Sequence, residues 1–349
     1  MTRPETPTVH DTVERPSYLT TALGRVFLAD SLEYMREEVR DQSVDLIMTS
    51  PPFGLVRKKD YGNPDASDYL DWFRPFAVEF RRVLCERGSL VIDIGGAWVP
   101  GQATRSLYHF KLVIMLCEEL GFHLAQEFYW WNPSRLPSPA EWVTVRRIRV
   151  KDAVNTVWWL SPTPWPKASN RRVLHPYSDS QLSLFENGYT PKKRPSGHEI
   201  SANFSNRNPG AIPPNLIAIA NTESNSAYLR YCEQEGIDPH PARYPAALPE
   251  FFVRMVTDRG DLVLDPFAGS CVTGEVCERL GRRWVCIDSV EEYLRGASGR
   301  FMPRGTARGQ GDNGEASYAI YRPDALWDRL RDEPLPEDGG ASRDSVADD

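Results

Sequence analysis

Apolar and polar positions follow two alternating patterns through the first third of the chain. Short apolar runs with the length of buried strands occur at 25–30, 44–48, 88–94 and 124–131. Between them, apolar residues recur every three or four positions, as in amphipathic helices, at 31–37, 69–84 and 107–120. Strands that alternate with helices predict an α/β fold with a mostly parallel sheet and helices on both faces.

The regular pattern stops after Trp131, where frequent prolines interrupt the chain. We interpret 133–235 as an irregular lobe inserted into the sheet domain. Helices are then predicted at 249–257, 273–280 and 291–301, with strands at 261–265 and 283–288. The predicted core therefore has two halves, 21–132 and 236–302. They are flanked by a flexible N-terminus at 1–20 and a flexible acidic tail at 303–349, with a brief helix at 325–330.

Composition excludes several classes of protein. With 41% hydrophobic residues the chain is too apolar to be wholly disordered, and no apolar run is long enough for a membrane helix. Residues 1–20 lack the apolar core of a signal peptide, so we expect a cytoplasmic protein with reduced cysteines. No Cys-x-x-Cys pair and no histidine cluster occurs, so no metal site is predicted.

The net charge of −7, taken for the whole chain, argues against a nucleic-acid partner. The charge is, however, unevenly distributed along the sequence. Residues 303–349 hold six basic and eleven acidic side chains, whereas residues 133–214 hold twelve basic and five acidic ones. The inserted lobe is therefore basic, and its charge is compatible with an anionic partner such as DNA.

A strand, a tight turn and a second strand suggest a site for an adenosine ligand. The first strand ends at Asp265, Gly269 lies in the turn that precedes a helix, and the next strand ends at Asp288. The dinucleotide pattern G-x-G-x-x-G is missing, which disfavours a diphosphate cofactor and favours S-adenosylmethionine (AdoMet), whose ammonium group Asp265 could hold. The alternative is that both acids only cap helices.

A second motif, Thr49-Ser50-Pro51-Pro52-Phe53, follows the strand at 44–48. Two prolines fix the backbone and present rigid carbonyl acceptors, and Phe53 offers a flat face for stacking. Such a site suits a heterocycle with an exocyclic amine, because fixed acceptors on the amine hydrogens localise its lone pair toward an incoming methyl group. An ordinary turn at the end of a strand is the alternative.

Together the two motifs resemble those of amino-methylating DNA methyltransferases. The Ser-Pro-Pro-Phe motif precedes the Asp-Pro-Phe-Ala-Gly-Ser motif of 265–270, which is the order of the circularly permuted β class, and Ser50 resembles the cytosine-N4 branch. The similarity extends to 49–63, 128–139, 147–159, 194–198 and 240–252, and covers roughly 20–300. It implies a Rossmann-like AdoMet-dependent methyltransferase fold, with the target-recognition region in the inserted lobe.

The resemblance also implies roles for individual residues. Ser50, Pro51, Pro52 and Phe53 would hold the target cytosine. The residues implied at the cofactor are Asp30, Asp265, Phe267, Gly269, Ser270, Asp288, and, in the last motif, Arg243 and Pro245. The chain departs from the family pattern at Cys271, where many relatives have glycine, and at Asp288, where Glu is frequent.

Three basic clusters are candidate DNA contacts, because a base inside a duplex must be flipped out to be methylated. They are Arg57, Lys58 and Lys59; Arg146, Arg147, Arg149 and Lys151; and Lys192, Lys193 and Arg194. Each could instead be a solvated face. The aromatic run 128–131 could stack on the base, although alternate members of a strand must face the core.

We therefore predict a site-specific, AdoMet-dependent DNA methyltransferase that acts on cytosine N4. It would modify double-stranded DNA in a restriction–modification system, beside a cognate endonuclease. The sequence predicts no particular oligomeric state. The alternatives are an adenine-N6 or RNA-base methyltransferase of the same fold, a non-catalytic AdoMet-binding DNA regulator, and, more distantly, a nicotinamide oxidoreductase.

Overall fold

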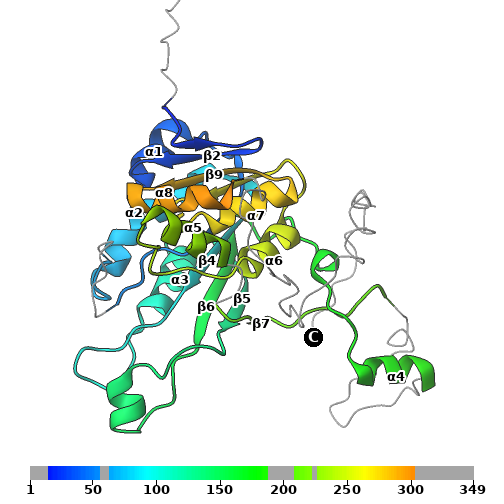
Figure 1. Ribbon diagram of the computed structural model, residues 1–349. Coiled ribbons are helices and arrows are strands. Elements are labelled where there is room, and N and C mark those ends of the chain that lie inside the picture. Colours follow the sequence, from blue (N-terminus) through cyan, green and yellow to red (C-terminus); the bar gives the residue numbers. More distant parts are fainter. Residues whose placement is uncertain (1–14, 56–62, 188–207, 222–225, 303–349) are drawn as a thin grey trace, which may run out of the picture. The chain divides into compact units, whose positions relative to one another are not determined.

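The computed structural model describes residues 15–55, 63–187, 208–221 and 226–302 of the chain (Figure 1). It divides into two units, one of Met1–Ser169 with Pro214–Arg308 and one of Asn170–Pro213 with Gly309–Asp349. The first unit holds the whole sheet. The predicted tail at 303–349 and its brief helix lie outside the described residues.

The sheet of the first unit has nine strands among the described residues, in the order β1-β2-β9-β8-β3-β4-β6-β5-β7. The strands are β1 Leu19–Thr20, β2 Gly24–Leu28, β3 Val44–Thr49, β4 Leu84–Ile94, β5 His123–Trp131, β6 Val154–Ser161, β7 Leu216–Ala218, β8 Leu262–Asp265 and β9 Arg283–Asp288. The five strands from β2 to β4 in this order are parallel, whereas β6 runs antiparallel to both β4 and β5. The mostly parallel α/β sheet predicted from the apolar runs is confirmed.

The helices of this unit form two groups by their contacts. The first group packs α1 Ser31–Glu38 against α2 Tyr69–Val83, and α2 against α3 Tyr108–Glu118. The second packs α6 Ala247–Val256 on α7 Val272–Leu280, and α5 Ser226–Glu235 on α8 Glu291–Ala297, which the short 3-10 helix η4 Ser298–Arg300 follows. In Figure 1 the second group lies in front of the strands.

Helix α2 shows why the predicted apolar stripe becomes a buried face. Its residues Phe73, Ala77 and Phe80 recur at helical spacing and are all fully buried in the main core. Burying a large apolar side chain stabilises the fold by about 1.5–3 kcal/mol, so this stripe fixes α2 on the sheet. The helix ends at Val83, where the chain enters β4 directly.

The inserted lobe is narrower than the proline pattern suggests. Strands β6 and β7 complete the sheet, and α5 packs in the first unit. Within the predicted lobe, only residues 170–213 belong to the second unit. The described elements of this segment are the 3-10 helix η2 Asn170–Val173 and α4 Asp179–Asn187. The sequence does not predict strand β6, because its apolar run, like that of a buried helix segment, carries no alternation that would mark it as a strand.

Strand register brings the predicted site residues to one edge of the sheet. The last residue of β2 pairs with Asp288, Asp265 of β8 pairs with Cys286, and Thr49 of β3 pairs with Ile92 of β4. Ligand sites of open parallel sheets lie at the carboxyl ends of the strands. No helix within the described ranges is long and apolar enough to cross a membrane.

Candidate active site

Asp265 lies at the centre of a buried hydrogen-bond network. Its Oδ1 accepts from the Thr49 hydroxyl at 2.8 Å and the Phe267 amide at 3.2 Å, and its Oδ2 accepts from Thr273 at 2.6 Å and Tyr244 at 3.2 Å. Burial raises the pKa of the Asp265 carboxyl to about 6, against the lowering effect of these donors. Both oxygens are occupied by the protein, so the carboxylate organises four segments around the turn.

The turn after Asp265 has a backbone that requires glycine. Gly269 has a φ of +49°, and a Cβ there would lie 3.0 Å from the His240 ring. The Gly269 amide donates to Asp288 Oδ2 at 2.8 Å, which links the ends of β8 and β9. The result is a tight, buried turn beneath a histidine ring, in which a side chain at position 269 would crowd that ring.

Cys271, the departure from the family pattern, has a backbone conformation that favours glycine. Its φ of +54° is in the left-handed region, and its amide donates to the Ala268 carbonyl at 2.7 Å. The side chain is fully buried. A non-glycine residue therefore holds this left-handed conformation, at a local backbone cost of about 1–2 kcal/mol.

The two remaining acids at the strand ends act as caps and keep acceptor capacity. Asp30 accepts from the amides of Leu32 and Glu33 at the start of α1 and is exposed. Asp288 Oδ1 accepts from Val290, and burial raises the pKa of its carboxyl. Capping and ligand binding are compatible here, because a carboxylate offers about four acceptor sites.

The segment before α6 closes the other side of the turn. Pro245 is buried, and its carbonyl accepts from Leu248 at the start of the helix. Arg243 lies over the Tyr228 ring, with its guanidinium carbon 5.7 Å from the ring centre. Tyr228 in turn accepts from the His240 amide at 2.9 Å. This network holds the His240 ring against the turn.

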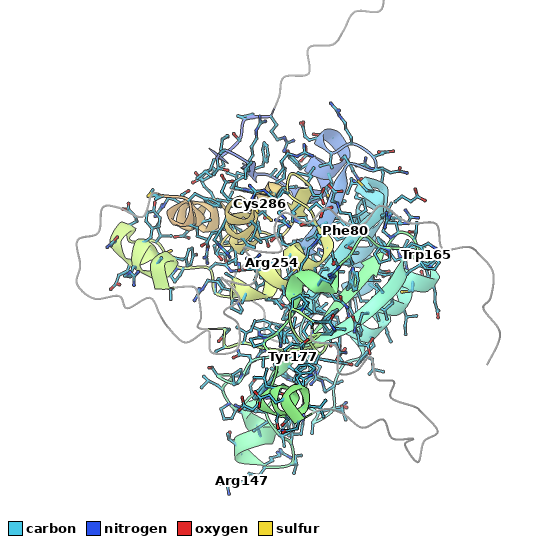
Figure 2. All side chains as sticks on the ribbon, turned by 90° about the vertical axis from the view of Figure 1, so that its right-hand side faces the viewer. Phe80, Arg147, Trp165, Tyr177, Arg254 and Cys286 are labelled. Carbon is cyan, nitrogen blue, oxygen red and sulfur yellow. The ribbon has the colours of Figure 1, made fainter. Side chains whose placement is uncertain are left out.

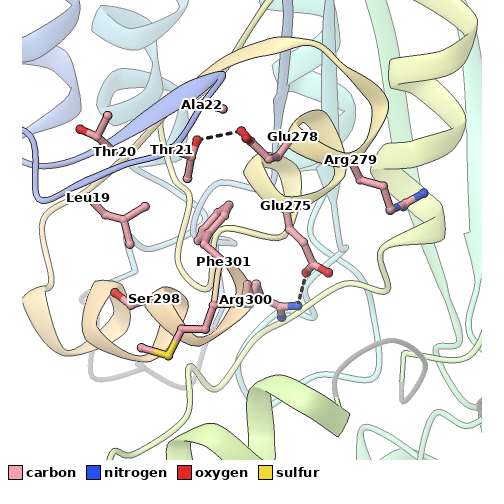
Figure 3. A pocket seen from close by; sticks show the side chains of 11 residues that line it. Leu19, Thr20, Thr21, Ala22, Glu275, Glu278, Arg279, Ser298, Arg300 and Phe301 are labelled. Atoms are coloured by element: carbon pink, nitrogen blue, oxygen red, sulfur yellow. Dashed lines mark hydrogen bonds and ion pairs between the residues drawn. The ribbon is translucent and has the colours of Figure 1, made fainter. Parts of the chain in front are cut away.

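Ser270 is held in place by the buried guanidinium group of Arg300. Arg300 Nε donates to the Ser270 carbonyl at 2.7 Å, and its Nη1 pairs with Glu275 at 2.8 Å. Arg300 and Glu275 also line a hollow of about 650 Å³ between α7 and residues 19–22 (Figure 3), where Thr21 donates to Glu278. None of the predicted site residues lines this hollow, so it is separate from the site at the strand ends.

The Ser-Pro-Pro-Phe motif is joined to a carboxylate that the sequence did not reveal. The Ser50 hydroxyl donates to Asp93 Oδ2 at 3.1 Å, and Asn155 Nδ2 donates to Asp93 Oδ1 at 3.1 Å. Asp93 is 2% exposed, and burial raises the pKa of its carboxyl to about 6. The sequence feature that could have identified Asp93 is its position as an acid within the apolar run 88–94, because a buried polar group requires hydrogen-bond partners.

Phe53 lies against the backbone that follows β4. A Cβ added at Gly95 would meet the Phe53 ring at 2.6 Å, so only glycine lets the ring occupy this place. Pro51 is buried, and Pro52 and Phe53 are partly exposed. The motif thus presents a ring and backbone carbonyls beside the hydroxyl of Ser50.

The basic clusters differ in what their cations contact. Arg57, Lys58, Lys59, Lys192, Lys193 and Arg194 lie outside the described residues. In the remaining cluster, Arg146 pairs with Glu141 and lies over Trp142, Arg149 pairs with Asp152, and Lys151 donates to two backbone carbonyls. Arg147 is exposed at a φ of +55°. Three of the four cations thus help to hold their own loop together.

The aromatic run alternates as a strand requires. Phe128 and Trp130 are buried, and Phe128 packs on Phe252 at 5.1 Å. Tyr129 and Trp131 are exposed on the other side. Within the described ranges, no cluster of His, Cys, Asp and Glu has the makings of a metal site.

A parallel sheet with a glycine turn and a Ser-Pro-Pro-Phe motif at its carboxyl edge is the architecture of amino-directed methyltransferases. A family model described as DNA methylase matches residues 44–298, and the chain belongs to this family. The predicted fold class and family are thereby confirmed.

Among its relatives is the Type II methyltransferase M.PvuII of Proteus hauseri. The two are 52% identical over 292 residues, which is 83% of this chain and 86% of the relative. A solved PvuII DNA methyltransferase, titled cytosine-N4-specific, aligns with a TM-score of 0.67 and 43% identity over 89% of this chain and 94% of that one. M.BglII of Bacillus subtilis is 26% identical over 78% of this chain and 67% of its own length.

Proposed function

We propose that the chain transfers the methyl group of AdoMet to the exocyclic N4 of a cytosine flipped out of duplex DNA. The observation that carries this proposal is the chain of hydrogen bonds from Ser50 through Asp93 to Asn155, beside a rigid Pro-Pro backbone and the Phe53 ring. The 52% identity to M.PvuII supports the choice of cytosine N4.

The residues at the strand ends fit AdoMet as the cofactor. The turn at Gly269 carries no side chain that would hinder the close approach of a ligand. Asp288 offers acceptors for the ribose hydroxyls, and Asp30 offers acceptors for the adenine amine. Phe267 and Ser270 belong to the turn itself, and Pro245 belongs to the segment beside it. AdoMet supplies an electrophilic methyl group on a sulfonium. Because Asp265 already accepts four hydrogen bonds, its acceptor sites are filled, and we assign it the positioning of the turn in place of direct contact with the ammonium group.

The hydrogen-bond chain suggests how the amine is activated. The Ser50 hydroxyl donates its hydrogen to Asp93, so its oxygen lone pairs are free to accept from the cytosine amine. A backbone carbonyl of the Pro-Pro segment accepts the second amine hydrogen, and Phe53 stacks on the ring. When N4 gains the methyl group it must lose one proton. That proton passes to Ser50 Oγ, while the Ser50 proton passes to Asp93.

The biological setting follows from the substrate. We infer that the enzyme protects DNA at one short sequence against an endonuclease of the same specificity, without direct contact between the two proteins. Its place is then the cytoplasm, where bacterial DNA lies.

The test is methylation of duplex DNA with labelled AdoMet, followed by nucleoside analysis and mapping of the modified cytosines in an unmodified host. We expect N4-methylcytosine at one sequence. Ser50→Ala should lose turnover and keep AdoMet binding, whereas Asp265→Ala should lose both. N6-methyladenine as the sole product would refute the base assignment, and full activity of the Ser50 variant would refute the mechanism.

A further inference from the structure

The loop between β5 and β6 rises from the edge of the proposed active site. Its stems are paired, since Trp131 is in register with Val154 and the Asn132 amide donates to the Ala153 carbonyl at 2.9 Å. The next residue of β6, Asn155, donates to Asp93. Figure 1 shows the loop extending beyond the ends of both strands, and Figure 2 labels Arg147 at its outer end.

The loop is held in one conformation by its own contacts. The carbonyl of Trp142, a buried residue of the π-helix Glu141–Val145, accepts from the amides of Ile148 and Arg149 at 2.9 and 3.2 Å. Asp152 pairs with both Arg149 and Arg105. A tip fixed in this way loses little conformational entropy when it binds a partner.

The tip nevertheless directs apolar side chains outward. Ile148 is 62% and Val150 85% exposed, whereas the Arg149 side chain between them is only 15% exposed, because it pairs with Asp152. Charged side chains usually face the solvent and aliphatic ones the interior. At this tip the arginine faces inward and the two aliphatic side chains face outward. Exposed apolar side chains on a fixed, protruding loop are typical of a contact surface.

The charge of the loop selects the partner. Residues 132–153 hold five basic and two acidic side chains, so an anionic partner is favoured. Arg147 adds an exposed guanidinium at the tip, in a left-handed backbone conformation that is costly for arginine. Cations that border an apolar tip match DNA, whose phosphates border stacked bases.

We infer that Ile148 and Val150 form a wedge that enters the DNA stack at the position the target cytosine leaves. The inference rests on the proposed function, because it assumes that the substrate base is extruded. Apolar side chains inserted between base steps hold the stack open in other DNA-binding proteins. Ile148 lies seven positions before Asn155, so the two Cα atoms are at most about 25 Å apart, about twice the width of the major groove. The tip can therefore contact the duplex while the base lies at Ser50.

The test compares the double variant Ile148→Ala/Val150→Ala with the wild type on two substrates. One is the matched duplex that carries the mapped recognition site, and the other has the target cytosine mispaired. On the matched duplex we expect kcat/KM to fall by about 10- to 100-fold, because unstacking is no longer assisted. On the mispaired duplex it should fall by less than about threefold, since that base is extruded easily.

Two further variants serve as controls. Ile148→Leu/Val150→Leu keeps the wedge apolar and should retain activity on the matched duplex. Ile114→Ala removes an isoleucine of α3 that is 51% exposed and should behave as the wild type. An unchanged AdoMet dissociation constant in all variants shows that the fold is intact.

The possible outcomes separate the wedge from the proposed function. The wedge is refuted if the alanine variant keeps full activity on the matched duplex, or if both substrates lose activity equally. The proposed function fails on a different result, namely that the wild type transfers no methyl group to cytosine in either substrate.

Discussion

Replacing Asp93 with Asn should yield an enzyme with much lower turnover that is nevertheless more stable above neutral pH. Asp93 is 2% exposed, and burial raises the pKa of its carboxyl from 3.8 to about 6. At pH 8 the folded protein therefore holds a carboxylate whose burial is costly. The rise in pKa corresponds to about 3 kcal/mol of lost stability, which the neutral amide does not incur.

The sign of the pH dependence follows from the two protonation states. Below pH 3.8 the carboxyl is neutral in both the folded and the unfolded chain, so it causes no difference. As pH rises, the unfolded chain releases the proton first, and stability falls until the folded carboxyl ionises near pH 6. Asp93→Asn should therefore be more stable than the wild type by up to about 3 kcal/mol at pH 8, and by about half as much at pH 5.

Turnover of the Asp93→Asn variant should fall although its stability rises, because the amide cannot take the proton from Ser50. Loss of a positioned proton acceptor lowers kcat by about 10²- to 10⁴-fold, with AdoMet binding unchanged. In the wild type, kcat should rise with pH through about 6 and then level off, since the ionised carboxylate is required.

The assays are urea unfolding at pH 5 and pH 8, single-turnover methyl transfer, and calorimetric titration with AdoMet. Asp71→Asn, which changes an exposed acid on α2, is the matched control and should leave all three unchanged. The reasoning is wrong if Asp93→Asn is less stable than the wild type at pH 8, or if its kcat stays within tenfold.

Other changes probe the turn and the β5–β6 loop. Gly269→Ala brings a methyl group to 3.0 Å from the His240 ring, so the AdoMet dissociation constant should rise at least about tenfold in calorimetry; unchanged binding would separate this turn from the cofactor. Cys271→Gly should keep AdoMet binding, whereas Cys271→Val should lose it, because a β-branched residue is strained at a φ of +54°; equal behaviour would contradict this. Arg147→Ala should reduce the salt slope of DNA binding in a filter assay by about one, whereas Lys151→Ala, whose ammonium group contacts two carbonyls, should not; the reverse order would exclude Arg147 as the phosphate contact.

Much of the fold was predictable because its signals are local. The apolar stripe of α2 and the apolar run of β3 are visible within a few residues, and both elements form where they were expected. The acids and glycine at the strand ends were predictable for the same reason, since parallel strands place their carboxyl ends at one edge. The sequence did not show that β6 joins the sheet, nor that β5 and β6 pair antiparallel, because pairing depends on partners elsewhere in the chain.

The sequence alone determined the chemistry at the ends of three strands: a Ser-Pro-Pro-Phe motif after one strand, Asp265 and Asp288 at the ends of two others, and a basic stretch between them. Only the tertiary structure decided which polar groups satisfy one another. Thr49 reaches Asp265 across 216 residues, and Ser50 reaches Asp93 across 43. The same packing turned Arg149 inward and left Ile148 and Val150 exposed. The physical reason is that periodicity follows from neighbouring residues, whereas burial and hydrogen bonding depend on segments that meet only after the chain has folded.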